Sequence, residues 1–225
     1  MTIHLQKDLD NLKKEVLNLG AMVVEAIDQA IISLVERRVD LAKKVSNGDD
    51  VINEKEVAIE EECLKILALH QPVATDLRFI ITVLKVNDEL ERMGDLAVNI
   101  AERASYLSAI DKLDIELDFP RMYDGTQKMV RASLESLINS DVKLAESVLA
   151  MDDEIDQINR DMYVVLQKQM KGNPDNVERA VHLLSTSRHL ERIADLSTNI
   201  AEDVVFMVKG ELIRHRVEDY SKDNS

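Results

Sequence analysis

Apolar residues recur at steps of three and four from residue 5 to residue 45, which is the spacing of one face of an α-helix. The only irregularities are one step of four in place of three and a gap at residues 37 and 38. The stripe consists of Leu5, Leu9, Leu12, Val16, Leu19, Val23, Ala26, Ala30, Leu34, Leu41 and Val45. This pattern predicts one long helix over about residues 3–46, ended by the polar run Ser46 to Asp50.

Five further helical segments are expected, because turn residues divide the rest of the chain into periodic stretches. Pro72 ends the second segment, since a proline disfavours helical geometry in the residue before it. Residues 111–123, which include Pro120, form the expected link between two halves of the chain. The expected helices cover about residues 50–70, 73–109, 121–149, 152–171 and 175–209.

The third and sixth of these helices carry the same motif. Residues 88–104 read DELERMGDLAVNIAERA and residues 188–204 read RHLERIADLSTNIAEDV, so nine of 17 positions agree at an offset of 100. Ordinary residue frequencies give about one agreement by chance. The earlier helices match at an offset of 103, which pairs Asp49 with Asp152. The chain is therefore predicted to be all-α, with six long helices in two tandem copies of a three-helix bundle.

The two copies set the expected boundaries. The first bundle is expected over residues 1–112 and the second over 113–216, followed by a polar tail at 217–225. Within the third helix, Val83, Val86, Leu90, Met93, Ala97, Ile100, Ala104 and Leu107 fall on one stripe, which is the expected core seam. Gly94 lies beside this seam, where a small residue lets a neighbouring helix approach.

Charge and composition exclude several classes of partner. The net charge is −15, and aromatic residues make up 3% of the chain with no tryptophan, so nucleic acid is not an expected partner. No stretch reaches 18 consecutive apolar residues, so direct membrane insertion is not expected. The N-terminus lacks the apolar core of a secretory signal, and Cys63 is the only cysteine. These features suit a cytoplasmic protein.

Oxygen-bearing side chains form a second stripe on the third helix and again on the sixth. Two like charges at i and i+4 cost a few tenths of a kcal/mol, and a bound cation would reverse that cost. A solvated acidic face is the alternative interpretation, but identical spacing in both copies favours a metal site. The residues are Glu91, Asp95, Asn99 and Glu102 in the first copy, and Glu191, Asp195, Asn199 and Glu202 in the second.

Two further acidic positions precede these stripes. Asp152 and Asp156 are spaced i, i+4, and their counterparts are Asp49 and Asn53, so the first copy has one carboxylate fewer. They either contribute metal ligands or cap the start of the expected helices, where acidic residues are favoured by the helix dipole. The two interpretations have equal support. Carboxylate and amide oxygens suit Mg²⁺, Mn²⁺ or Ca²⁺ and also iron, and zinc held by carboxylates remains compatible.

No catalytic constellation is present. The chain lacks a glycine-rich phosphate loop, a nucleophile elbow and the H-E-x-x-H motif. A carboxylate-bridged di-iron enzyme needs Glu-x-x-His motifs, and neither Glu91 nor Glu191 has a histidine three residues later. Three hypotheses follow in order: a metal-binding protein without catalytic activity, a helical scaffold without metal, and a carboxylate-bridged metalloenzyme.

The motifs resemble those of the PhoU family of phosphate-uptake regulators. HQPVATDLRFI at 70–80 with DELERMGDLAVNIAE at 88–102 is similar to that family's first signature, and RHLERIADLSTNIAE at 188–202 is similar to its second. FMVKGELIRH at 206–215 resembles its C-terminal pattern. The resemblance covers nearly the whole chain.

This resemblance implies two bundles related by pseudo-two-fold symmetry, often in a homodimer. It implies metal ions at E(D)xxxD motifs, which here are Glu91 with Asp95, Glu191 with Asp195, and Asp152 with Asp156; the pair Asp49 and Asn53 departs from the motif. It also implies negative control of phosphate uptake and of phosphate-starvation signalling. The implied partners are the ATPase subunit of the phosphate ABC transporter and a sensor histidine kinase.

Overall fold

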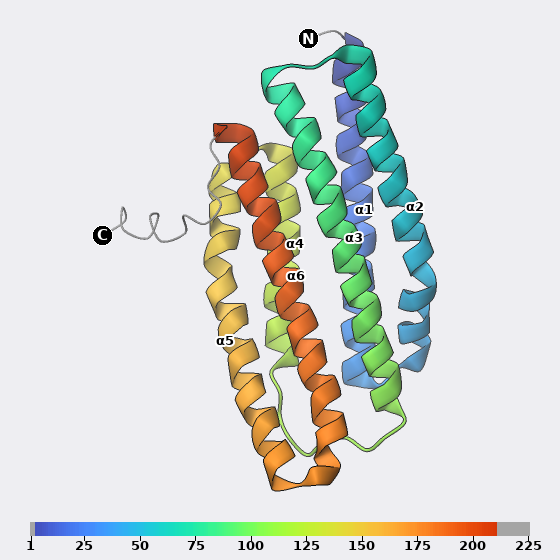
Figure 1. The fold of residues 1–225 in the computed structure, drawn as a ribbon, viewed down its shortest axis with the longest axis vertical. Helices are drawn as coiled ribbons and strands as arrows, with labels where there is room; N and C mark the ends of the chain where they lie inside the picture. The colour runs from blue at the N-terminus through green and yellow to red at the C-terminus, as the bar shows by residue number, and fades with distance from the viewer. Residues whose placement is uncertain (1–2, 211–225) are drawn as a thin grey trace, which may run out of the picture.

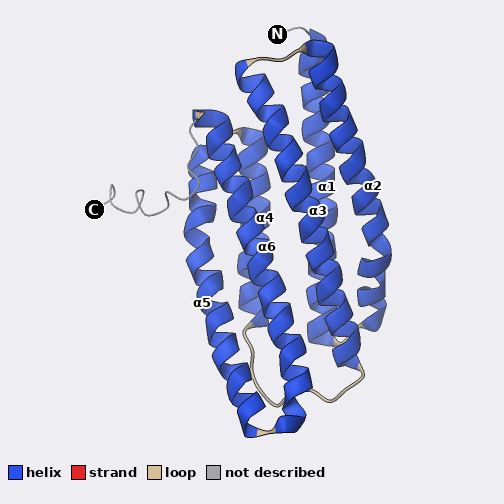
Figure 2. Cartoon of the chain, in the orientation of Figure 1, coloured by secondary structure: helices blue, strands red, loops and turns tan. Residues whose placement is uncertain are grey.

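The computed structural model describes residues 3–210, and every regular element in that range is a helix (Figure 2). The expected polar tail at 217–225 and the end of the 206–215 motif lie outside the described residues. The elements are α1 (Ile3–Glu36), α2 (Val39–His70), α3 (Ala74–Ser108), α4 (Phe119–Asn139), α5 (Val142–Gly172), the short 3₁₀ helix η1 (Pro174–Asn176) and α6 (Val177–Lys209).

The six α-helices form two three-helix bundles that lie side by side (Figure 1). Helices α1, α2 and α3 pack together in the first bundle, and α4, α5 and α6 pack together in the second. Helices α3 and α6 run antiparallel and form most of the contact between the bundles. The predicted all-α duplication is thus confirmed. The expected boundary at residues 112 and 113 lies within the linker between α3 and α4.

The prediction of one helix over residues 3–46 was wrong. Arg37 adopts a left-handed backbone conformation with φ of 61°, so α1 ends at Glu36 and α2 begins at Val39. The Arg37 guanidinium donates to the backbone carbonyls of Leu107 and Ile110, which holds this turn against the end of α3. The gap at 37 and 38 in the apolar stripe was the signal for this break.

The expected stop at Ser46–Asp50 is instead the interior of α2. Gly48 costs a helix interior only about 1 kcal/mol. That cost is offset because Val45 and Ile52, on either side of it, are both buried on the core face of α2. The second helix therefore starts eleven residues earlier than expected.

The same error recurs in the second copy. Ser140 has φ of 53° and ends the helix expected over 121–149, and α5 begins at Val142 rather than at 152. The Asp141 carboxylate accepts a hydrogen bond from the backbone N–H of Leu144 at 3.1 Å, which caps α5. Arg37 and Ser140 are related by the offset of 103, so the two copies turn at equivalent positions.

The expected seam on α3 forms the core of the first bundle, and all eight of its residues are buried. Gly94 faces α2, where an added Cβ would lie 3.3 Å from the Ile52 Cγ2 atom. Over its most apolar 18-residue window, α1 has the length and composition of a membrane span, but half of that window is buried in the structure. We interpret α1 as a core helix, because it packs against α2, α3 and α4.

Polar contacts fix the register of α3 against α6. Lys85 donates to the Asp203 carboxylate at 2.8 Å, and Asp203 is buried. Toward the other end of the interface, the Tyr106 ring stacks on the His182 ring with centroids 4.1 Å apart. These contacts hold the two bundles in a defined antiparallel alignment.

Candidate metal-binding clusters

The first acidic cluster lies between α2 and α3 and consists of Asp49, Asn53, Glu56, Glu91 and Asp95. Burial and then repulsion from Asp95 raise the pKa of Asp49 above its ordinary value. Burial, followed by repulsion from Asp95, Glu56 and Asp49, likewise raises the pKa of Glu91. Carboxylates from two helices therefore share one partly dehydrated region in which each opposes the ionisation of its neighbours.

Hydrogen-bond acceptors in the first acidic cluster lack donors. The Asn53 amide donates to Asp49 Oδ2 at 3.3 Å, but the buried Asp49 Oδ1 and Asn53 Oδ1 atoms have no hydrogen-bond partner. Buried acceptors without partners are rare in native proteins. An ion coordinated by oxygen would satisfy them, so the residues present fit a hard cation.

The second acidic cluster lies between α5 and α6 and consists of Asp152, Asp156, Glu191 and Asp195. Burial, together with repulsion first from Asp195 and then from Asp156, raises the pKa of Asp152 to about 6. Burial, followed by repulsion from Asp195 and then from Asp156, raises the pKa of Glu191. Burial, followed by repulsion from Asp156, raises the pKa of Asp195. Asp156 forms an ion pair with Arg160 at 3.0 Å. The charges of Arg188 and Arg192 partly oppose the raised pKa of Glu191.

The capping interpretation of Asp49 and Asp152 is excluded. Each lies ten residues beyond the first residue of its helix, far from the exposed backbone N–H groups of the first turn. Repulsion from Asp95 on α3 contributes to the raised pKa of Asp49, and repulsion from Asp195 on α6 contributes to that of Asp152, so each lies near a carboxylate of the neighbouring helix.

Glu56 belongs to the first acidic cluster, although the sequence interpretation did not include it. At the offset of 103, Asn53 corresponds to Asp156 and Glu56 corresponds to Asn159. The first copy therefore has an amide followed one turn later by a carboxylate, and the second copy has them in the reverse order. The supporting contacts are also equivalent: Asn87 donates to Glu56, and Ser187 donates to Asn159. The sequence signal was this exchange, visible once the two copies are aligned through residue 56.

The remaining stripe residues do not join the clusters in the same way. The Asn99 amide donates to the backbone carbonyl of Asp95 at 2.9 Å, within its own helix. The Asn199 amide crosses to α3 and donates to Glu89 at 3.2 Å. Glu102 is exposed and Glu202 is half-buried, one to two turns beyond the clustered carboxylates. The structure therefore brings together Asp49, Glu91 and Asp95 in one bundle, and Asp152, Asp156, Glu191 and Asp195 in the other.

Within residues 3–210, no three Asp, Glu, His or Cys side chains converge tightly enough to form a ready-made ligand set. The carboxylates interact through their charges across each helix pair without touching. Holding an ion would therefore require these side chains to move closer together than they lie in the structure.

The chain is similar in sequence to a known protein family and to several of its members. The family model described as the PhoU domain matches the chain twice, over residues 16–104 and 119–204. A phosphate-specific transport system accessory protein PhoU homolog of Aquifex aeolicus is 39% identical over 212 residues, which cover 94% of this chain and 96% of that protein. PhoU homolog 1 of Thermotoga maritima is 33% identical over 210 residues, which cover 92% and 90%.

Two crystal structures share the fold. PhoU from Pseudomonas aeruginosa aligns with a TM-score of 0.88 at 33% identity, covering 92% of this chain and 99% of that chain. The phosphate transport system regulatory protein PhoU from Streptococcus pneumoniae aligns with a TM-score of 0.82 at 28% identity, covering 92% and 98%.

Proposed function

The chain belongs to the PhoU family, and from that premise we propose that it is a metal-binding negative regulator of phosphate uptake and of phosphate-starvation signalling. Its relatives are named as accessory proteins of phosphate-specific transport, not as enzymes. The observation that carries the metal-binding part is the pair of equivalent acidic clusters, one in each bundle, with dehydrated carboxylates. The unpartnered oxygens of Asp49 and Asn53 are further support.

The proposed role of the metal is structural and electrostatic. A divalent ion at either cluster would stabilise the charged form of carboxylates that now repel one another, and would cross-link α2 to α3 or α5 to α6. Oxygen ligands suit Mg²⁺, Mn²⁺ or iron, and zinc is compatible. The first cluster would use Asp49, Glu91 and Asp95, and the second would use Asp152, Asp156, Glu191 and Asp195.

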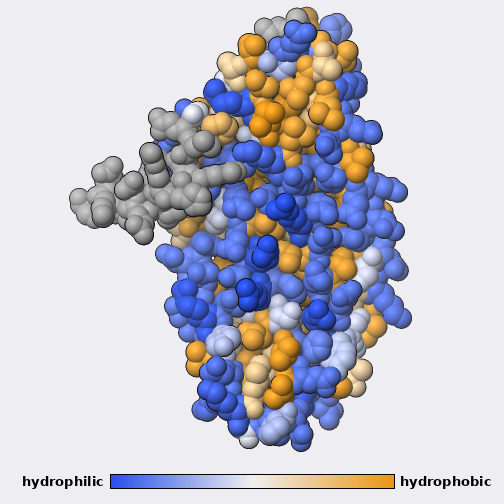
Figure 3. All heavy atoms as spheres, in the orientation of Figure 1, coloured by the Kyte–Doolittle hydropathy of each residue, from blue (hydrophilic) through white to orange (hydrophobic). Residues whose placement is uncertain are grey.

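The proposed partners are the ATPase subunit of the phosphate ABC transporter and a sensor histidine kinase, with the chain acting between them in the cytoplasm as a homodimer. Two surface features support protein partners. An exposed apolar area surrounds the start of α3 at Leu69, Val73, Leu77 and Ile81, and Figure 3 shows apolar residues gathered at that end of the molecule. Hydrophilic residues cover the middle of the same face, and the net charge of −15 suits docking to basic surfaces.

The test compares the Asp95→Asn, Asp195→Asn double variant with the unaltered chain. We expect the double variant to retain less metal after purification without added metal and to lose repression of a phosphate-starvation reporter in phosphate-replete cells. A matched control is Glu61→Gln with Glu135→Gln, which removes the same charge at two exposed positions outside the clusters.

Two outcomes would contradict the proposal. The first is equal metal content in the double variant and the control. The second is full repression by a double variant that has lost its metal, which would favour the helical scaffold. Affinity capture from phosphate-replete cells tests the partners, and recovery of neither the ATPase subunit nor the kinase would contradict the adaptor role.

A further inference from the structure

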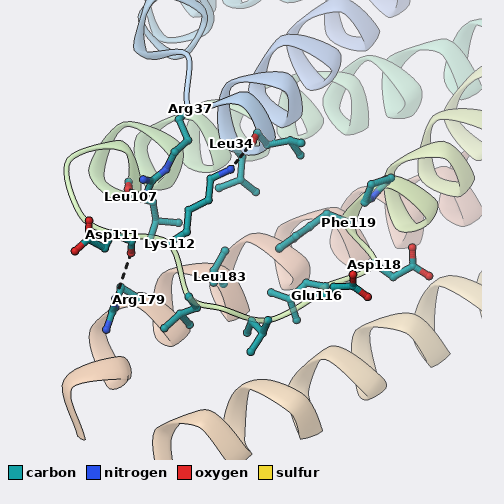
Figure 4. Close-up of a pocket in the computed structure, with 15 residues that line it drawn as sticks. Leu34, Arg37, Leu107, Asp111, Lys112, Glu116, Asp118, Phe119, Arg179 and Leu183 are labelled. Carbon is teal, nitrogen blue, oxygen red and sulfur yellow. Dashed lines mark hydrogen bonds between the residues drawn. The ribbon is translucent and has the colours of Figure 1, made fainter. Parts of the chain in front are cut away.

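A pocket of about 670 Å³ lies where the two bundles meet, beneath the linker between α3 and α4 (Figure 4). This volume falls within the range of small-molecule sites in proteins. Apolar side chains from both bundles and from the linker form its wall: Leu34, Leu107, Leu113, Ile115, Phe119 and Leu183.

The linker presents an apolar edge to the pocket. Leu113, Ile115 and Leu117 are half-buried, whereas the residues between them, Asp114 and Glu116, are exposed. This alternation is that of an extended chain with one face turned inward. The inward-facing side chains of the linker therefore form one wall of the pocket.

Three cationic side chains gather at one end of the pocket, and all three bind backbone carbonyls. No Arg37, Lys112 or Arg179 nitrogen lies within ion-pair distance of a carboxylate in the described part of the chain. A carbonyl satisfies a donor but leaves the positive charge unneutralised. Arg37 donates to the carbonyls of Leu107 and Ile110, Arg179 to that of Asp111, and Lys112 to that of Val35.

The acidic side chains of the pocket rim do not neutralise this end. In Figure 4 the carboxylates of Glu116 and Asp118 lie at the opposite end of the view from Arg37, and Asp111 is the one acidic residue labelled at the cationic end, where it faces three cations. Asp118 lies 4.0 Å from Arg121, outside the pocket. The pocket thus has a cationic end beside an apolar wall.

We propose that this pocket binds a free amphiphilic anion. Its carboxylate or phosphate-type head would contact Arg37, Lys112 and Arg179, and its apolar body would lie against Leu113, Ile115 and Leu183. Arg37 and Arg179 donate to the linker carbonyls of Ile110 and Asp111, and Lys112 of the linker donates to the Val35 carbonyl, so the bound head would compete for donors that fasten the linker to both bundles. This site is independent of the acidic clusters and of the proposed metal.

The test is calorimetric titration of the full chain with dodecanoate below its micellar concentration. We expect saturable binding at one site per chain. Dodecyltrimethylammonium has the same tail with a positive head, and acetate has the head without the tail, so neither should bind measurably. Saturable binding of the cationic amphiphile with equal affinity would overturn the proposal, because it would show apolar adsorption without charge recognition.

Variants locate the site. Lys112→Gln removes one exposed cation and should weaken dodecanoate binding by about tenfold, since a charge-assisted hydrogen bond contributes that much to affinity. Lys7→Gln, an exposed site on α1 remote from the pocket, should leave binding unchanged. Ile115→Ser on the linker should also weaken binding, and it alters no helix. Unchanged affinity in both pocket variants would overturn the proposal.

A vesicle experiment separates free amphiphile from membrane lipid. The chain is mixed with phosphatidylglycerol vesicles and sedimented. Failure to sediment, together with dodecanoate binding, supports a free ligand. Sedimentation with vesicles in the absence of dodecanoate binding would overturn the proposal in favour of a membrane surface.

Discussion

The buried carboxamide of Asn87 on α3 donates to Glu56 on α2, at 2.8 Å to its backbone carbonyl oxygen and at 3.2 Å to its carboxylate. Asn87 thereby holds Glu56 beside Glu91, and burial followed by repulsion from Glu60 raises the pKa of Glu56. The first bundle has Asn53 where the second bundle has the carboxylate of Asp156. The Glu56 carboxylate, held by Asn87, lies one helical turn after Asn53 and can take its place.

We therefore expect Glu56→Gln to weaken metal binding by the first bundle by about 10-fold to 100-fold, the usual effect of losing a group that supports a metal site. Metal affinity would be measured by competition with a chelator in an Asp152→Asn, Asp195→Asn background, which isolates the first cluster. Glu54→Gln, an exposed change on the same helix, is the control. Equal affinities for the two variants would show that Glu56 takes no part.

The ion pair between Lys85 and Asp203 should contribute to the stability of the two-bundle arrangement. Lys85→Met removes the ammonium that pairs with the Asp203 carboxylate, which is 5% exposed. We expect a loss of about 2–3 kcal/mol in the free energy of unfolding by urea, less than for a fully buried pair because Lys85 is 35% exposed. The Lys85→Met, Asp203→Leu double variant should recover much of that loss. If it unfolds as easily as the single variant, the charge is not the cause.

Gly48 offers a stabilising substitution. It lies in the interior of α2, its φ is not positive, and no atom outside its own helix backbone lies within 4 Å of an added Cβ. Gly48→Ala should raise the free energy of unfolding by about 0.5–1 kcal/mol, because alanine restricts the unfolded chain and favours the helix. The contrasting change is Gly210→Ala, where φ of 75° makes a side chain unfavourable. Destabilisation by Gly48→Ala would indicate that residues 46–50 are not helical in solution.

Acidification should weaken the contact between α3 and α6 at His182. Burial, followed by repulsion from Arg103 on α3, lowers the pKa of His182, and Glu178 on its own helix opposes that effect. The unfolded chain therefore binds a proton at this residue at higher pH than the folded chain does. The stability contribution is present above about pH 6.5 and is lost as the pH falls through the lowered folded-state pKa.

His182→Gln removes this titration. We expect its free energy of unfolding to fall less than that of the unaltered chain between pH 7 and pH 5, as measured by urea unfolding at each pH. His4→Gln serves as the control, because His4 is exposed near the start of α1. Parallel pH profiles for the His182 variant and the unaltered chain would contradict the assignment.

Periodicity sufficed to predict six helices, the duplication and the core seam on α3, because each depends on side chains that are close together in sequence. It did not place the helix ends at Glu36 and Asn139. The gap at 37 and 38 in the apolar stripe was a local sign of the turn at Arg37, but the carbonyls that hold this turn lie some 70 residues away, and no local pattern records them. The turn at Ser140 had a local signal in the capping residue Asp141, but the apolar stripe continued across it and masked the break.

The candidate clusters were predictable in part for the same reason. Glu91 with Asp95 and Glu191 with Asp195 follow from spacing on one helix. Glu56 did not, because its place beside Glu91 depends on how α2 packs against α3. The pocket beneath the linker was not predicted at all, since its wall combines residues from α1, α3, α4, α6 and the linker, which periodicity treats separately.

The antiparallel packing of α3 on α6 also bears on how this chain arose. A helix that pairs with a near-copy of itself about a two-fold axis is what a dimer of a single ancestral repeat would use. At the offset of 100, however, Lys85 corresponds to Ser185 and Asp203 corresponds to Arg103. Two first repeats would set Lys85 against Arg103, and two second repeats would leave Asp203 facing a serine. The ion pair between Lys85 and Asp203 can therefore form only between unlike halves, which favours their pairing with each other over self-association of either half.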